Sequence, residues 1–141
     1  MAMRNGFGLA TLFALTLGAL CGCLDRSDEY GSINEARSER VFEKGWLPDF
    51  LPETTRDLKV VTTIDVSAGR GRFIFDPEEY PSFSARLSDY DGSMPKVDGD
   101  AKAARRLLYE GYEARVYSSG GTYWLFLCEA HEGVCEFFVW Q

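Results

Sequence analysis

Histidine is almost missing from this chain, because His131 is the only one among 141 residues. A Ser–His–acid site would have to use it, and the sequence has no Gly-x-Ser-x-Gly motif, the turn that presents the nucleophile in many hydrolases. A zinc site needs three or four ligands, and one histidine falls short of such a set. The acidic stretch Asp89-Tyr90-Asp91-Gly92 lacks the full pattern of a calcium loop. We therefore predict no catalytic residue, no metal site and no cofactor.

Basic residues are in deficit, with 15 Lys and Arg against 22 Asp and Glu and a formal net charge of −7. Nucleic-acid binding depends on the neutralisation of phosphates by Lys and Arg, so the composition argues against a nucleic-acid partner. It argues equally against docking on anionic lipid head groups through a basic patch. Solubility is the simplest reason for the acidic balance, and a cationic protein partner stays open.

The sequence also lacks an apolar run that could span a bilayer, which takes ~20 residues. Its most apolar stretch, residues 9–20, follows a single cation, Arg4, and ends at Leu20-Cys21-Gly22-Cys23. A short apolar region behind a positive charge is typical of a signal peptide. An aliphatic residue three places before a cysteine, with a small residue directly before it, matches the bacterial lipobox. We predict a lipoprotein signal peptide over residues 1–22 and lipidation of Cys23, with an ordinary cleaved signal as the alternative.

The residues after the predicted cleavage site indicate where the protein is held. Leu24 follows Cys23, in place of the aspartate associated with inner-membrane retention in enteric-type bacteria. We therefore expect a cell-envelope protein, anchored by its lipid in the outer membrane and facing the periplasm. Residues 23–141 number 119, which is one domain's worth of chain. Because Arg4 is the only charge lost with the signal peptide, the mature net charge becomes −8.

Of the four cysteines, only two remain available to form a bond in the mature fold. Cys21 leaves with the signal peptide and Cys23 carries the lipid, so Cys128 and Cys135 are the remaining thiols. They flank a predicted four-residue loop, 130–133, between two strand-like runs, which places them opposite each other and within reach of an S–S bond. Disulfides persist in the envelope compartment. We predict a Cys128–Cys135 disulfide in preference to a metal site or a nucleophile.

Periodicity and turn residues predict a single α+β domain with an antiparallel sheet of about five strands and two or three helices. Residues 23–32 are polar and without periodicity, which predicts a lipidated tether ahead of a domain over residues 33–141. A Ser32/Glu35 capping box opens the first predicted helix. The predicted helices are 33–44, 81–88 and 101–110, the last capped by Asp100, and the predicted strands are 58–65, 72–75, 112–118, 123–129 and 134–140. Glycines 69 and 71 favour a hairpin turn before the second strand.

The segment from residue 45 to residue 58 is apolar and irregular. Pro48 and Pro52 exclude a regular helix or a central strand there. Four large apolar residues accompany them: Trp46, Leu47, Phe50 and Leu51. We predict that the segment lies as an extended clamp across the core, and an exposed docking arm for a partner is the competing interpretation.

Aromatic residues gather in the last third of the chain. Strand alternation over 123–129 puts Tyr123, Leu125 and Leu127 on one face and Trp124 and Phe126 on the other. One face must be core. The other is either covered by the helices and the clamp or exposed as an interaction patch.

The clamp and the strand after it also resemble a known family. Residues 46–58 read Trp-Leu-Pro-Asp-Phe-Leu-Pro-Glu-Thr-Thr-Arg-Asp-Leu, and Ile64-Asp65 and Phe73 follow at characteristic distances. This pattern is similar to that of small uncharacterised bacterial lipoproteins with a YbbD head domain. The residues that carry the resemblance are Trp46, Pro48, Phe50, Pro52, Asp65 and Phe73.

The resemblance implies a small α+β fold behind a lipid anchor, and it brings no reaction, since the function of the family is unknown. The chain departs from the pattern at Thr62-Thr63 and Val66-Ser67, where relatives carry His-Asn/Asp and Thr-Asn. If those polar residues form a site in the relatives, this chain lacks it.

Together these features predict a membrane-anchored bacterial lipoprotein whose domain is a non-catalytic binding or scaffolding module of the cell envelope, with an envelope protein as a possible partner. The alternative is a small acidic inhibitor or immunity-like protein that binds a basic envelope enzyme such as a lysozyme. A hydrolase ranks last, because no nucleophile–base pair is evident.

Overall fold

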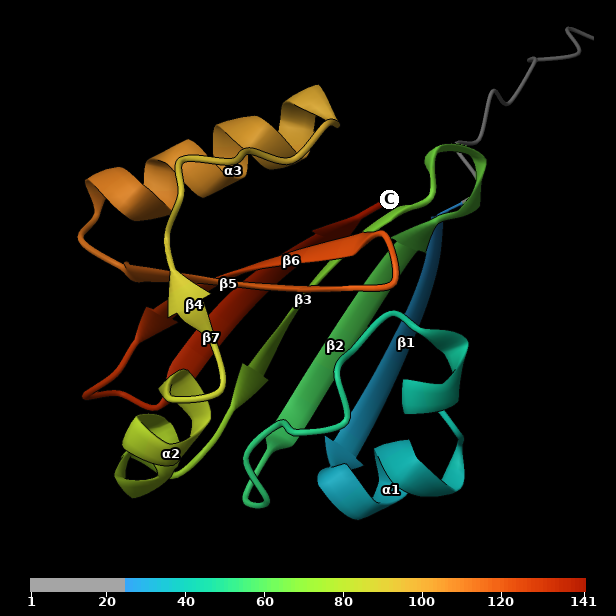
Figure 1. The fold of residues 1–141 in the computed structure, drawn as a ribbon. Helices are drawn as coiled ribbons and strands as arrows, with labels where there is room; N and C mark the ends of the chain where they lie inside the picture. The colour runs from blue at the N-terminus through green and yellow to red at the C-terminus, as the bar shows by residue number, and fades with distance from the viewer. Residues whose placement is uncertain (1–24) are drawn as a thin grey trace, which may run out of the picture.

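One antiparallel sheet of seven strands runs through the molecule in the order β1-β2-β3-β7-β6-β5-β4 (Figure 1). The computed structural model describes residues 25–141, so the predicted signal peptide and Cys23 lie outside the described residues. The strands are β1 (Asp25–Ser32), β2 (Arg56–Thr63), β3 (Ala68–Ile74), β4 (Ser88–Asp89), β5 (Glu113–Ser119), β6 (Thr122–Glu129) and β7 (Val134–Trp140). The helices are α1 (Ile33–Ser38), α2 (Tyr80–Ser84) and α3 (Asp98–Tyr109), with 3₁₀ turns η1 (Phe42–Lys44), η2 (Ile64–Val66) and η3 (Pro77–Glu79).

The α+β fold agrees with the prediction, but the strand count and the tether do not. Asp25–Ser32 is strand β1, which pairs with β2 from Asp25↔Thr63 to Ser32↔Arg56. The prediction of a tether over 23–32 was therefore wrong for its last eight residues. An edge strand needs few apolar contacts, and Tyr30 is the single fully buried side chain of β1. The second extra strand, β4, has only two residues and pairs with β5.

The hairpin of β2 and β3 turns earlier than its glycines indicate. The connection is η2 with Ser67 in a left-handed conformation, so Gly69 and Gly71 lie inside β3. A Cβ on Gly71 would stand 2.0 Å from the carbonyl oxygen of Lys59 and 2.5 Å from the Phe137 ring. Glycine is therefore required by close approach within the sheet, and the predicted hairpin turn at these glycines was wrong.

The first helix begins as predicted and ends sooner. Ser32 Oγ accepts a hydrogen bond from the Glu35 amide at 3.2 Å, and the Glu35 carboxylate accepts one from the Gly31 amide at 2.6 Å. The helix stops at Ser38 because Arg40 takes a positive φ of 57°, which turns the chain and buries Val41. The segment closes through η1 at Gly45, whose φ is 79°.

The other two helices also differ in their limits. α2 is a short helix that follows η3, and it covers less than the predicted 81–88. α3 begins at Asp98, so Asp100 lies in its first turn and does not act as the N-cap. Asp100 is buried and pairs with Arg70 of β3, with 2.7 Å between Oδ1 and Nη1. Its role is to tie α3 to the sheet.

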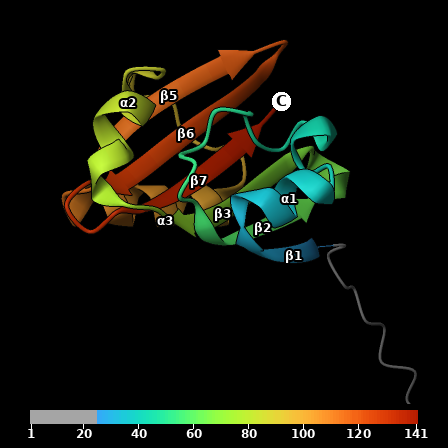
Figure 2. The same cartoon turned by 90° about the horizontal axis from the view of Figure 1, so that it is seen from below.

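The two faces of the sheet carry separate layers. α1, the irregular segment and α2 cover one face, which we call the clamp face, while α3 lies on the opposite side, the α3 face (Figures 1 and 2). Trp124 and Phe126 of β6 are buried on the clamp face, and Leu125 and Leu127 are buried on the α3 face. β6 and β7 are thus covered on both sides, and their aromatic residues form core and not an exposed patch.

The irregular segment packs against the clamp face. Leu47 and Leu51 are 2% and 3% exposed, and both prolines are buried. Trp46 is half-buried, and its carbonyl oxygen accepts a hydrogen bond from Trp124 Nε1 at 3.1 Å. Phe50 meets Tyr117 edge-on, with 4.9 Å between ring centroids. Side-chain burial therefore holds down a stretch that has no strand pairing of its own.

We expect Leu51→Ala to lower the free energy of unfolding by about 2–5 kcal/mol, because it empties a buried site in the clamp. Asp49→Ala is the matched control, since Asp49 is exposed in the same segment. Urea denaturation of both variants measures the difference. Equal stabilities for the two variants would show that the segment is an independent arm and not part of the core.

Gly71→Ala should destabilise the domain strongly, because the new methyl group would collide with the Lys59 carbonyl and the Phe137 ring. Gly99→Ala is the control, since nothing lies within 4 Å of the Cβ position there and alanine favours the helix. Melting temperatures of the two variants test this account. A Gly71→Ala domain as stable as the wild type would contradict the close packing of β3 on β7.

Candidate functional site

The α3 face is covered over only part of its width. α3 packs on β5, β6 and β7 through a cluster that includes Leu107, Val116 and Leu125. A hollow of about 370 Å³ lies beside the helix, and we call it the α3 groove. Its side chains come from four elements: Lys59 and Val61 of β2, Arg70 and Arg72 of β3, Glu136 and Phe138 of β7, and Ala103 of α3.

Strand register arranges the groove in two rows. Arg72 lies between Lys59 on one neighbouring strand and Glu136 on the other, which makes a charged row across the sheet. One step along, Arg70 lies between Val61 and Phe138, which supply the apolar part of the floor. The groove therefore places ions directly beside apolar surface, the combination that fixes both affinity and orientation in binding sites.

Two of the three cations in the groove already have partners. Lys59 Nζ lies 3.3 Å from a Glu29 carboxylate oxygen, and Arg70 pairs with buried Asp100. Arg72 is exposed and has no ion pair with any residue between 25 and 141. Its guanidinium can thus donate two parallel hydrogen bonds to the carboxylate of a partner.

A second hollow of about 320 Å³ adjoins the groove on the side of the edge strand. The two hollows share Lys59 and Arg72, and Glu29 and Asp57 also line the second. The concave surface therefore continues from α3 to β1, and Arg72 stands near its middle.

The residues that carried the family resemblance do not form this site. Trp46, Pro48, Phe50 and Pro52 lie in the segment on the clamp face, and Phe73 is fully buried beneath them. Asp65 lies at the exposed turn η2, far along β3 from Phe73. The motif is thus structural, and its members are not brought together at one surface.

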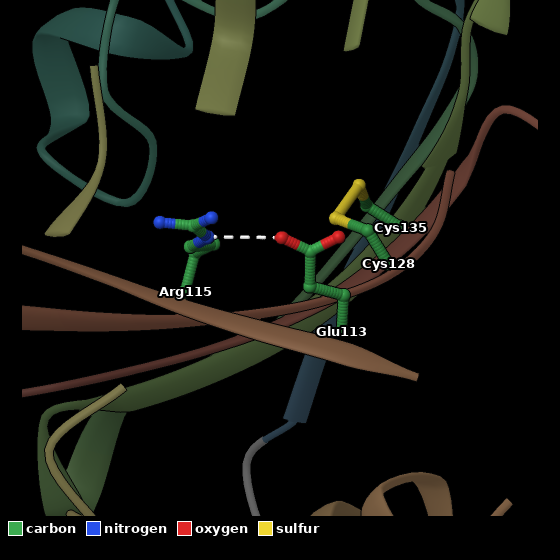
Figure 3. Close-up of a disulfide and its surroundings, with 4 residues drawn as sticks. All are labelled: Glu113, Arg115, Cys128 and Cys135. Carbon is green, nitrogen blue, oxygen red and sulfur yellow. Dashed lines mark hydrogen bonds and ion pairs between the residues drawn. A yellow bond between two sulfur atoms is a disulfide. The ribbon is translucent and has the colours of Figure 1, made fainter. Parts of the chain in front are cut away.

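The disulfide forms as predicted. Cys128 and Cys135 face each other across β6 and β7 with 4.1 Å between their Cα atoms, and the neighbouring pair is Glu129↔Val134 (Figure 3). Both cysteines are buried on the clamp face. His131 is exposed in the turn that the disulfide closes.

Glu113 and Arg115 lie beside the disulfide on β5 (Figure 3). Arg115 Nε donates a hydrogen bond to Glu113 Oε1 at 3.0 Å, and its Nη1 donates to Asp89 Oδ1 at 2.7 Å. Burial raises the pKa of nearby Tyr80 to about 12, and the Glu113 carboxylate adds to the rise. The Tyr80 hydroxyl has no hydrogen-bond partner of normal geometry among residues 25–141.

Two classes of site are missing from the part of the chain that the structure describes. Over residues 25–141, no three His, Cys, Asp or Glu side chains are grouped so as to hold a metal ion. Within the same range, no helix is both long and apolar enough to cross a membrane.

Sequence reasoning missed the groove because it assigned Arg70 to a turn and began the second strand only at Arg72, whereas β3 runs from Ala68 to Ile74. The signal was present in the alternation of β2, where Lys59 and Val61 interleave with the buried Leu58 and Val60. Such alternation shows that one face of a strand carries ions, but it does not show which neighbouring strands extend that face.

Comparison with known proteins finds one family model that is similar to part of the chain. Residues 26–74 match the family model of the YbbD head domain, which confirms the resemblance found in the sequence. The match runs from β1 to the last residue of β3, and α2, α3 and β4–β7 lie outside it. No curated protein and no solved structure matches the chain significantly.

Tyr80→Phe should reduce the fall in the free energy of unfolding that occurs as the pH rises above 10. Between pH 10 and 12 the unfolded tyrosine releases its proton while the folded one keeps it, so stability falls as the pH rises through this range. At neutral pH the variant should be as stable as the wild type or slightly more so, because it removes a buried hydroxyl without a partner. Tyr109→Phe, at a 93% exposed position, is the control. Chemical denaturation at pH 8, 10 and 11.5 measures the free energy of unfolding of each variant. The same fall in that free energy with pH for Tyr80→Phe and Tyr109→Phe would refute this role of burial.

Proposed function

We propose that this chain is a lipoprotein of the bacterial cell envelope, anchored through acylated Cys23, whose domain is a non-catalytic binding module. The lipobox Leu20-Cys21-Gly22-Cys23 supports the anchor. The match to the YbbD head domain is consistent with a bacterial envelope-associated protein. The Cys128–Cys135 disulfide fits a compartment in which such bonds persist.

The α3 groove is the observation that carries the binding role. Its floor contains Val61 and Phe138, and Arg72 presents a guanidinium without an ion pair among the described residues. This chemistry fits a segment of another envelope protein that sets a carboxylate against Arg72 and an apolar side chain beside the half-buried Val61. A charge-assisted bidentate pair would fix the orientation of that segment, and apolar contact would add affinity.

Substitution of Arg72 tests the proposal. Arg72→Glu should reduce capture of the partner from an envelope extract about tenfold or more, since hydrogen bonds to charged groups are worth roughly 1.5–3 kcal/mol. Arg105→Glu makes the same change of net charge at an exposed position that lines neither hollow. Quantitative mass spectrometry of the captured proteins compares the wild type and the two variants. The same set and amount of proteins on both variants would exclude the groove as the binding site.

One observation keeps the acidic inhibitor as a second candidate. The side chain of Asp89, at the edge strand β4, is 96% exposed even though it pairs with Arg115, so a basic enzyme could still approach its carboxylate. That mode of binding would weaken steeply with ionic strength and would not depend on Arg72. Inhibition of a basic lysozyme that survives Arg72→Glu and disappears at high salt would favour this candidate over the binding module.

A further inference from the structure

The proposed anchor stands at the same end of the sheet as an exposed apolar turn. Cys23 is two residues before Asp25, and two residues span at most about 7 Å. Asp25 pairs with Thr63, and its Oδ1 accepts a hydrogen bond from Thr63 Oγ1 at 2.6 Å. The turn η2 begins at the next residue, Ile64, so the start of β1 lies beside this turn (Figure 1). A lipid on Cys23, two residues before β1, would therefore be held close to the turn.

The turn exposes two aliphatic side chains. Ile64 is 62% exposed and Val66 is 53% exposed. Among residues 25–141 the one other exposed large hydrophobic residue is Tyr109. Tyr109 is the last residue of α3, just before β5. The first residue of β5 pairs with Cys128, at the end of the sheet opposite Thr63. Tyr109 therefore lies at the far end of the domain from the turn. Apolar exposure is therefore concentrated next to the anchor.

We propose that the Ile64–Val66 turn enters the interface of the bilayer that holds the lipid of Cys23, so that the domain rests on the membrane in one orientation. This inference depends on the proposed acylation of Cys23. The anchor confines the turn to the membrane surface, where the effective concentration of bilayer is high, so two modest side chains suffice. Without the anchor, so small an apolar surface would not hold the protein on a membrane.

Charged neighbours limit the depth of insertion. Asp65 lies between the two aliphatic residues and is exposed, so its carboxylate stays at the level of the head groups. Lys44 lines a small hollow together with Ile64 on the clamp face, where Arg26 already pairs with Asp28, with 2.9 Å between Nε and Oδ2. The Lys44 ammonium group fits a phosphate of the lipid head groups. The turn therefore enters the interfacial region and does not reach the middle of the bilayer.

The orientation leaves the α3 groove accessible. Lys59 precedes Ile64 by five residues along β2, which corresponds to about 17 Å at the rise of an extended strand. Arg72 pairs with Lys59, so it lies at the same height above the turn. A partner would reach the groove just above the membrane surface and not within it.

A fluorescent probe on the turn tests the placement. Ile64→Cys, labelled with an environment-sensitive dye, is purified from membranes in its acylated form and reconstituted into vesicles of phosphatidylcholine and phosphatidylglycerol that contain lipids spin-labelled at the head group. Tyr109→Cys is the control at the far end of the domain. We expect a blue-shifted emission and several-fold stronger quenching at position 64 than at position 109. Val66→Cys, as a second reporter, should behave like Ile64→Cys.

Mass spectrometry of the same samples separates the two ways in which the inference can fail. An unmodified Cys23 would overturn the lipid anchor and this placement with it. An acylated protein whose labels at positions 64, 66 and 109 are quenched equally would overturn the placement alone, and the anchor would stand.

Discussion

The pairing of β3 with β7 holds the two halves of the chain together. It joins Ala68↔Trp140 through Ile74↔Val134, residues that lie far apart in sequence. The pairing requires that β3 carry no side chain at Gly71, where Phe137 fills the space. The family match ends with β3, so the matched unit presents a strand edge that β7 covers. The N-terminal half therefore depends on the C-terminal half to complete its sheet.

Unequal covering of the two faces follows from this arrangement. Three segments cover the clamp face, whereas α3 and the loop before it, through Tyr90 and Met94, cover part of the opposite face (Figure 2). Polar and charged side chains occupy the remainder, and the ion pair of Arg70 with Asp100 fixes the edge of the helix beside them. The α3 groove is thus the part of the wide sheet that the helix leaves uncovered, and the charged side chains that line it determine which partner it can bind.

The sequence predicted the features that depend on local pattern. Alternation and the two cysteines located β7 and the disulfide, and the capping box located the start of α1. The sequence did not predict β1, because only Tyr30 of its eight residues is fully buried and the strand shows no alternation of apolar and polar residues. Gly71 was misplaced in a turn because the side chain that requires a glycine there, Phe137, is remote in sequence. The groove combines β2, β3, β7 and α3, so no local pattern contains it.

The assignment of residues 25–32 to β1 changes what an anchor at Cys23 would do. A flexible tether would let the domain turn freely above the membrane, because the reach of a random coil grows with its length. A two-residue link has a reach of only about 7 Å, so an anchor at Cys23 would hold the start of β1 close to the membrane. The first strand of the sheet would then transmit the position of the lipid directly to the turn after β2. In such a molecule the membrane itself orients the groove, and binding and anchoring are set by the same two strands.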